Sequence, residues 1–347
     1  MSATSTSQDT GKFAASVGGD AAESPALNAA TMKHDAWAWM PRLAVPVLGG
    51  LLCFVFSLLT DDFLSRGNFT DILNSAALPV IVAVALTLCL VIGEFDLSIA
   101  ATSGLSTMVV SVLAVRHDWT TASAVTAALL VSIAIGTFNG ISVAYFGMNA
   151  LIVTIAMSSI LNGIEFLISG STQIFGGYPP EFIDFGRGKL GPLSNLVWVA
   201  MVIVAGCWLL LDKTSFGRHM RAVGGNDNAA YLMGVKVRRL RLTAFALCGG
   251  LVGLAGVLYA ARQGSAYPLT GLNVLLPSFA AAFIGAATIR VGEFNVLGTV
   301  IGVLVIQISA NGLLLLNVPS YATYIFHGTI LFIALLFARL VTRGQRR

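Results

Sequence analysis

The chain has 347 residues and a formal net charge of +4, with 56% hydrophobic and only 10% charged residues. Soluble domains carry about 25% charged residues. This chain therefore cannot cover its outside with solvated side chains, which excludes an ordinary soluble globular protein. Its apolar runs recur at lengths close to the ~20 residues that a membrane-crossing helix needs. Composition and run length together predict an all-α, polytopic bundle of transmembrane helices.

The N-terminal segment differs from the rest of the chain. Residues 1–35 are rich in Ser, Thr, Ala, Asp and Gly, a composition typical of disorder. They lack the basic region and apolar core of a secretory signal peptide. An interfacial anchor ahead of the first span is then predicted from Trp37, Trp39 and Arg42. We expect residues 1–42 to form a disordered cytosolic tail that ends in this anchor.

Ten apolar segments are candidate membrane spans. They run over residues 43–60, 71–92, 97–115, 122–146, 150–169, 193–211, 242–262, 272–288, 296–315 and 320–340. Only Gly93 to Asp96 separate the second from the third, which predicts a tight surface turn or a break inside the membrane. The segment 272–288 is short and contains Pro277, which indicates a tilted, broken or re-entrant helix. We expect about ten spans over 43–340, and the sequence is also compatible with any count from eight to eleven. Residues 341–347 are expected to form a basic cytosolic tail.

The distribution of Lys and Arg predicts the orientation, because cytoplasmic loops carry an excess of these residues. With ten crossings and a cytoplasmic N-terminus, fifteen of the twenty Lys and Arg fall inside and five outside. The inner loop 212–241 alone carries seven of them. We expect both termini in the cytoplasm. The outer loop 170–192 is expected to form a periplasmic cap or a partner contact.

Motifs for nucleotide hydrolysis and covalent chemistry are absent from the sequence. It holds no GxxxxGK[ST] phosphate loop, no HExxH and no GxSxG. The four histidines are scattered, and each of the four cysteines lies in an apolar run without metal-ligand spacing. Such cysteines are typical packing residues. We expect no enzyme activity, no metal and no cofactor on this chain, so active transport would need an ion gradient or a partner subunit.

Ionisable residues are rare within the predicted spans. Glu165 is the main exception, and it is either a proton or substrate site or a carboxylate near the outer membrane face. The second interpretation is favoured because the outer loop begins about four residues later. Asp96 precedes Leu97 and Ser98 at a predicted helix start, where a capping role is favoured over direct substrate contact.

Uncharged amides are the other polar residues of the predicted bundle. Asn139 and Asn311 each precede a glycine, and Gln307 lies one helical turn before Asn311 on the same face. An amide in lipid needs a partner, so these side chains form interhelical hydrogen bonds or line a path for a neutral, hydroxyl-rich solute. Both interpretations stand equally at this point. Small residues spaced by four between 249 and 256 predict closely packed helices.

The inner loop carries the most specific pattern in the chain. Residues 214–234 read T-S-F-G-R-H-M-R-A-V-G-G-N-D-N-A-A-Y-L-M-G. This resembles the T-x-F-G-R-x-x-x-A-x-G-G-N-x-x-A-A-x-x-x-G signature of ribose-type ABC transporter permeases. The similarity continues at Asp96-Leu97-Ser98, at the two Asn-Gly pairs of the spans, and over 296–302, so it covers approximately 70–340.

The resemblance implies a type II-like ABC importer permease for a monosaccharide or related polyol. Such subunits pair with a second permease copy or paralogue, bind cytosolic ATP-binding subunits that carry the ATP, and receive solute from a periplasmic binding protein. Partners are thus proteins and the lipid bilayer, and no nucleic acid is expected. The resemblance also implies a location in the inner membrane of a bacterial cell. The inner loop would form a coupling helix against the ATPase, with Asp227 capping a helix over 228–233 and Gly234 ending it.

The resemblance and the polar residues of the predicted spans together give the candidate site residues. Those for coupling to the ATPase are Gly225, Asn226, Asp227, Ala229, Ala230 and Gly234. Those for the translocation pathway or gate are Asp96, Asn139, Asn311 and Gln307.

Departures from the family pattern leave other functions open. Glu94 and Phe95 stand where the family has glycine and a β-branched residue, and Glu293 interrupts a later glycine-rich stretch, which favours a solute other than ribose. The alternatives are an ion-coupled secondary carrier that uses Glu165 and an ABC permease for a branched amino acid or nucleoside. A membrane enzyme is the least favoured, because no catalytic constellation is present.

Overall fold

The computed structural model describes residues 40–319 together with 321–322, 325–326, 328–329 and 332. Apart from Met40, all of these belong to one structural unit, Pro41–Arg347. The predicted tail 1–42, except for its last three residues, lies outside the described residues. So do most of the predicted span 320–340 and all of the tail 341–347.

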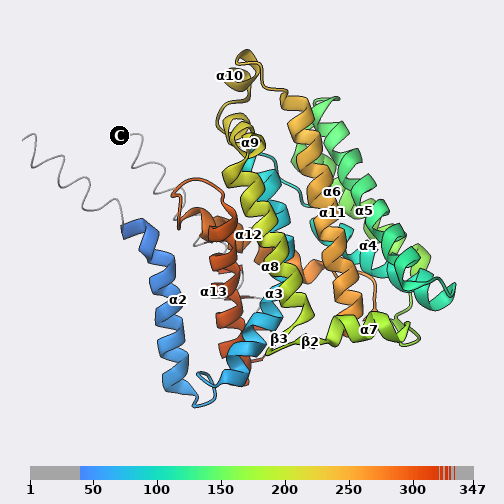
Figure 1. The fold of residues 1–347 in the computed structure, drawn as a ribbon, viewed down its shortest axis with the longest axis vertical. Coiled ribbons are helices and arrows are strands. Elements are labelled where there is room, and N and C mark those ends of the chain that lie inside the picture. Colours follow the sequence, from blue (N-terminus) through green and yellow to red (C-terminus); the bar gives the residue numbers. More distant parts are fainter. Residues whose placement is uncertain (1–39, 320, 323–324, 327, 330–331, 333–347) are drawn as a thin grey trace, which may run out of the picture. The chain divides into compact units, whose positions relative to one another are not determined.

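The described residues are mainly helical (Figure 1). The long helices are α2 (Met40–Leu59), α3 (Arg66–Val91), α4 (Ile99–Ser111), α5 (Thr121–Ala144), α6 (Ala150–Ser169), α8 (Asn195–Trp208), α11 (Val237–Gln263), α12 (Leu272–Ala286) and α13 (Val296–Leu315). A π-helical turn extends α4 as η1 (Val112–Arg116), and another extends α8 as η2 (Leu209–Lys213).

Seven described helices are long and apolar enough to cross a membrane: α3, α4 with η1, α5, α6, α8 with η2, α11 and α13. Two shorter apolar helices cover Val45–Leu59 and Leu272–Ala286. The prediction of about ten spans is therefore not confirmed, although a helix occupies each of the first nine predicted segments. Helix α12 rises about 22 Å over its 15 residues, less than the ~30 Å hydrocarbon core. It is short, as predicted, and Pro277 lies inside it.

Short elements gather at one end of the bundle. Helix α7 (Pro180–Arg187) lies between two small antiparallel pairs. Strand β1 (Ile174–Phe175) pairs with β4 (Ser265–Ala266), and β2 (Lys189–Leu190) pairs with β3 (Leu193–Ser194). The predicted outer loop 170–192 is thus a structured cap over this end. The opposite end carries two further helices, α9 (Ser215–Gly225) and α10 (Asp227–Leu232), both within the predicted inner loop (Figure 1).

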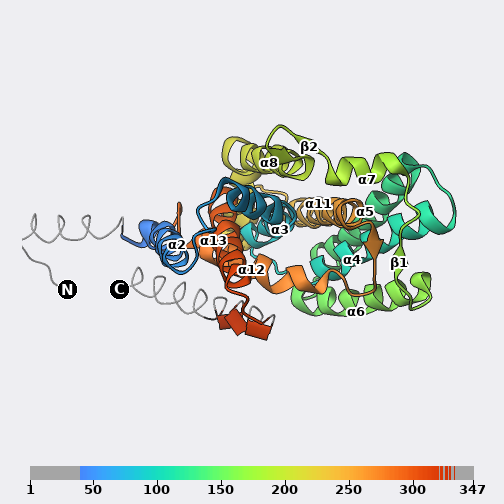
Figure 2. The same ribbon diagram turned by 90° about the horizontal axis from the view of Figure 1, so that it is seen from below.

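Helix α11 lies at the centre of the packing, against α3, α4 and α5 (Figure 2). Glycines permit this approach, as predicted from their spacing. A Cβ at Gly249 or Gly253 would collide with Ser132 of α5, and one at Gly256 would collide with the backbone of α4. The hydroxyl of Ser106 on α4 donates to the carbonyl of Gly253 at 2.7 Å. Close backbones and interhelical hydrogen bonds replace the hydrophobic drive that lipid cannot supply.

Candidate coupling surface and buried polar residues

Helix α9 begins and ends at residues fixed by local hydrogen bonds and by packing. The Thr214 side chain accepts from the amide of Gly217 and so caps the helix. The two glycines near its end differ. A Cβ at Gly224 would collide with the carbonyl oxygen of Val91 on α3, whereas one at Gly225 meets nothing within 4 Å. The predicted coupling residue Gly225 is thus exposed, and its neighbour Gly224 makes the tight contact with the bundle.

Helix α10 follows at once and is closed at both ends. The Asn226 side chain accepts from the amide of Ala229 at 3.0 Å, so Asn226 and not Asp227 is the cap. The prediction that Asp227 caps this helix is wrong, because the helix begins one residue earlier than expected. At the other end, Gly234 adopts a left-handed φ of 82°, and Val235 N–H donates to the Ala230 carbonyl at 3.0 Å. This Schellman arrangement confirms Gly234 as the helix stop.

The end of α10 presents three consecutive apolar side chains to solvent. Tyr231, Leu232 and Met233 are 70%, 83% and 84% exposed. Of the two predicted alanines, Ala229 is also exposed, whereas Ala230 is buried. Exposed apolar patches outside a membrane mark protein–protein contacts. The sequence interpretation missed these three residues, although three apolar residues in succession within a polar loop are a visible signal.

An ion-pair chain ties α10 to the bundle. Arg241 at the start of α11 contacts Asp227 at 3.1 Å and Glu94 at 2.8 Å. Glu94 lies in the α3–α4 junction, so these two ion pairs join three segments that are distant in sequence. Burial raises the pKa of Glu94, and the Arg241 guanidinium opposes that shift. The glutamate that departs from the family pattern thus has a structural partner in this chain.

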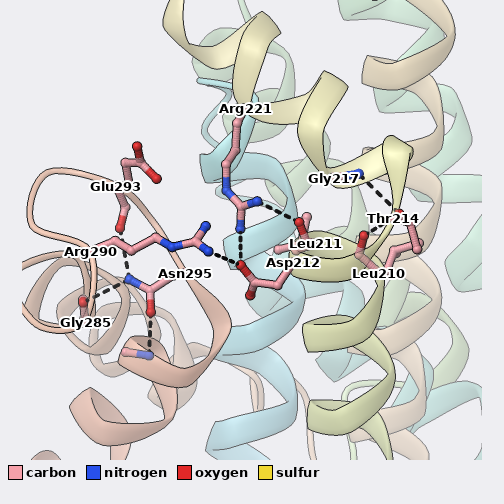
Figure 3. Close-up of polar contacts among 11 residues, drawn as sticks. Leu210, Leu211, Asp212, Thr214, Gly217, Arg221, Gly285, Arg290, Glu293 and Asn295 are labelled. Atoms are coloured by element: carbon pink, nitrogen blue, oxygen red, sulfur yellow. Dashed lines mark hydrogen bonds and ion pairs between the residues drawn. The ribbon is translucent and has the colours of Figure 1, made fainter.

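A second ion-pair cluster ties α9 to the bundle (Figure 3). Asp212 in η2 accepts from Arg221 of α9 at 2.7 Å and from Arg290 of the α12–α13 loop at 2.8 Å. Arg221 also donates to the carbonyl of Leu211 at 2.7 Å. The basic residues predicted to share one side of the membrane therefore meet at one end of the bundle.

Two of the predicted pathway residues are linked in the core. The Asp96 carboxylate accepts from the amide and the hydroxyl of Ser98 at 2.9 and 2.6 Å. The Asn139 side-chain amide donates to the same hydroxyl at 2.9 Å. All three side chains are buried. The prediction that Asp96 caps α4 is wrong, because the helix begins two residues later than expected, with Ser98 as its N-cap residue. Asp96 instead binds Ser98, and Asn139 brings α5 into the same network.

The other two predicted pathway residues lie apart from this network. Asn311 and Gln307 are on α13, which packs against α3, α8 and α12, whereas α5 packs against α4, α6 and α11. The Asn311 carbonyl oxygen is buried and has no hydrogen-bond partner among the described residues.

Glu165 is more deeply buried than its distance from the outer loop predicts. It has no exposed surface, and one carboxylate oxygen accepts from the amide of Leu269 at 2.7 Å. The other oxygen has no partner among the described residues, and the absence of a Cβ at Gly104 gives it room. Glu165 does lie near the end of α6, but the loop before α12 covers it. It thus holds that loop against α4 and α6.

The fold also brings together two of the four cysteines. Cys89, Asp96 and Cys248 are buried, and their potential ligand atoms lie within 4.8 Å of one another. The sequence could not predict this cluster, because its members come from α3, the junction and α11. Structural zinc sites use four donors, and the Asp96 carboxylate already accepts two hydrogen bonds from Ser98. Packing, as predicted for the cysteines, remains the simpler role.

Fold and site define the class: a multi-pass helical membrane protein with three exposed apolar side chains at one end of the bundle. The family model for the permease component of branched-chain amino acid transport systems matches residues 68–335. The chain belongs to this family of transport permeases, which are not enzymes. No solved structure matches it.

Curated relatives extend over nearly the whole chain. The L-arabinose ABC transporter permease protein of Azospirillum brasilense is 32% identical over 93% of this chain and 94% of its own. The ribose import permease protein of Escherichia coli strain K12 is 31% identical over 87% of this chain and 94% of its own. The D-allose transport system permease protein of the same strain is 29% identical over 86% and 91%. These relatives confirm the resemblance to ribose-type ABC permeases.

Proposed function

We propose that this chain is the membrane-spanning subunit of an ATP-driven importer for a monosaccharide or related polyol. The observation that carries the proposal is the apolar tip of α10, Tyr231 to Met233, at the end of a sequence signature shared with sugar permeases. The relatives named for arabinose, ribose and allose support the substrate class. ATP would be bound and hydrolysed by a separate subunit, and this chain would carry no cofactor.

The two ion-pair groups give the tip a physical connection to the bundle. Force on α10 would pass through Arg241 to Glu94 and the α3–α4 junction, close to the Asp96–Asn139 network. Force on α9 would pass through Asp212 to Arg290 and the α12–α13 loop. ATP binding on the partner would then bias two arrangements of these helices, which is how a ligand shifts a conformational equilibrium.

The proposal includes the orientation of the chain in the membrane and the proteins that it binds on each side. The end with α9 and α10 would face the cytoplasm of a bacterial cell, with both termini on that side, as the Lys and Arg distribution indicates. The cap of α7 and the short strands would face the periplasm and the solute-binding protein. A second permease copy or paralogue would complete the pathway.

Co-purification tests the proposal. The chain is expressed with the ATPase and the binding protein encoded beside its gene, and retention of the ATPase is measured in detergent. Replacing Ala229 and Leu232 by aspartate should abolish retention, because both side chains are exposed at the tip and tolerate the change in the free chain. Replacing Leu167 by aspartate serves as the control. This side chain is exposed near the end of α6, at the end of the bundle away from α10. Equal retention by the tip variant and the wild type would contradict the proposal.

An ion-coupled carrier remains the rival class, and the comparisons do not favour it. It would need Glu165 as a proton site. The contact of Glu165 with the Leu269 amide gives this residue a role in holding the loop that does not require proton transport.

A further inference from the structure

An apolar groove runs along the surface between α3, α8 and α13. It encloses about 400 Å³ and has only apolar residue types in its lining, including Val197, Ala200, Ala205 and Trp208 of α8. Val197 and Trp208 are eleven residues apart, which is a rise of about 17 Å along the helix. One leaflet contributes about half of the ~30 Å hydrocarbon core. The groove therefore matches a single extended acyl chain in both length and polarity.

The groove ends in a polar pocket. This pocket of about 190 Å³ shares Trp208 and Leu297 with the groove and adds Asp212, Lys213 and Arg290. The Lys213 ammonium lies 5.3 Å from the centroid of the Trp208 ring. It makes no ion pair with any described residue. Tryptophan and basic side chains at this depth are typical of the boundary between hydrocarbon and headgroups.

The pocket has an excess of positive charge. Asp212 is the acidic group at its centre, and it is already paired with both Arg221 and Arg290 (Figure 3). Glu293 is the nearest other acidic side chain drawn, and it points away from Asp212 (Figure 3). The pocket lining itself holds two cations, Lys213 and Arg290, and one anion, Asp212, which leaves one positive charge in excess. The arrangement is complementary to one additional negative charge.

We propose that this groove binds one anionic phospholipid. An acyl chain lies against Ala200 and Ala205, and the phosphate is held between Lys213 and Arg290. Basic pockets between transmembrane helices bind anionic headgroups in the same way. Because Arg290 also holds Asp212, the lipid would stabilise the link between α9 and the α12–α13 loop. The proposal depends on membrane insertion and not on the transported solute or the ATPase.

Native mass spectrometry of the full-length chain in detergent tests the proposal. The chain is incubated with phosphatidylglycerol or with phosphatidylcholine, and the retained lipid is counted. We expect one phosphatidylglycerol to be retained in preference to phosphatidylcholine. Lys213→Gln should weaken retention about fivefold, the effect of about 1 kcal/mol per basic residue near a lipid surface. Lys236→Gln, which removes an exposed lysine at the same end, should change nothing.

A second pair of variants tests the groove itself. Ala205→Leu places a larger side chain in the groove from an exposed position and should prevent retention, whereas Ala134→Leu, at an exposed position on α5, should not. Equal retention of both lipids, or retention unaffected by Ala205→Leu, would overturn the proposal. Loss of a dimer with Ala205→Leu, with no lipid retained by the wild type, would overturn it in favour of a second copy of the chain in the groove.

Discussion

Truncating Leu232 at the tip of α10 should weaken binding of the ATPase without destabilising the free chain. Its side chain is 83% exposed, so the chain alone gains little from it. Full burial of a leucine side chain contributes about 1.5–3 kcal/mol, and Leu232→Ala removes most of it. A loss of about 2 kcal/mol corresponds to an approximately 30-fold rise in Kd.

The assay for Leu232→Ala has two readings. The Kd for the ATPase is measured on immobilised permease in detergent, and thermal unfolding is measured on the permease alone. The account predicts the rise in Kd with an unchanged Tm, whereas Leu167→Ala at the other end should leave both unchanged. A Leu232→Ala variant that unfolds early while binding the ATPase normally would refute the reasoning, because the side chain would then contribute to the fold and not to the interface.

Three further predictions concern the same end of the bundle. Gly224→Ala should lower the free energy of unfolding by about 1–3 kcal/mol through overpacking, while Gly225→Ala is neutral or slightly stabilising. An unchanged Tm for Gly224→Ala would show that this glycine is not constrained. Gly234→Ala places an alanine in the left-handed backbone conformation of Gly234, at a cost of about 1–2 kcal/mol, and should reduce the affinity for the ATPase. Unchanged affinity would mean that the helix stop is not needed for binding. Alanine variants of Glu94 and Arg241 should show a coupling energy of about 0.5–3 kcal/mol in unfolding, and simple additivity would argue against the ion pair.

The sequence predicted the helices well, because each span is a continuous apolar run. It also located the loop that folds into α9 and α10. It misplaced the cap by one residue, since Asn226 and Asp227 are both good caps and their order of preference depends on the backbone. It could not tell that Gly224, and not Gly225, packs against Val91, because only the packed structure shows this contact; the coupling role of Gly225 stays a prediction.

Contacts between distant segments could not be predicted from one sequence. The loop that covers Glu165 begins about a hundred residues later in the chain, so spacing alone placed this carboxylate at the membrane face. The same limit applies to Ser98, which joins Asp96 to Asn139, and to Arg290, which reaches Asp212 from the α12–α13 loop. In each case the partner lies far away in the sequence, and no local pattern identifies it.

Uptake of labelled monosaccharides into proteoliposomes distinguishes an ATP-driven importer from an ion-coupled carrier. The chain is reconstituted with its ATPase and binding protein, and uptake is compared with and without ATP inside the vesicle. The account predicts uptake of at least one sugar that needs ATP, the ATPase and the binding protein, and that is lost with the tip variant of α10. Uptake that proceeds without the ATPase, follows a proton gradient and is lost with Glu165→Gln would contradict it.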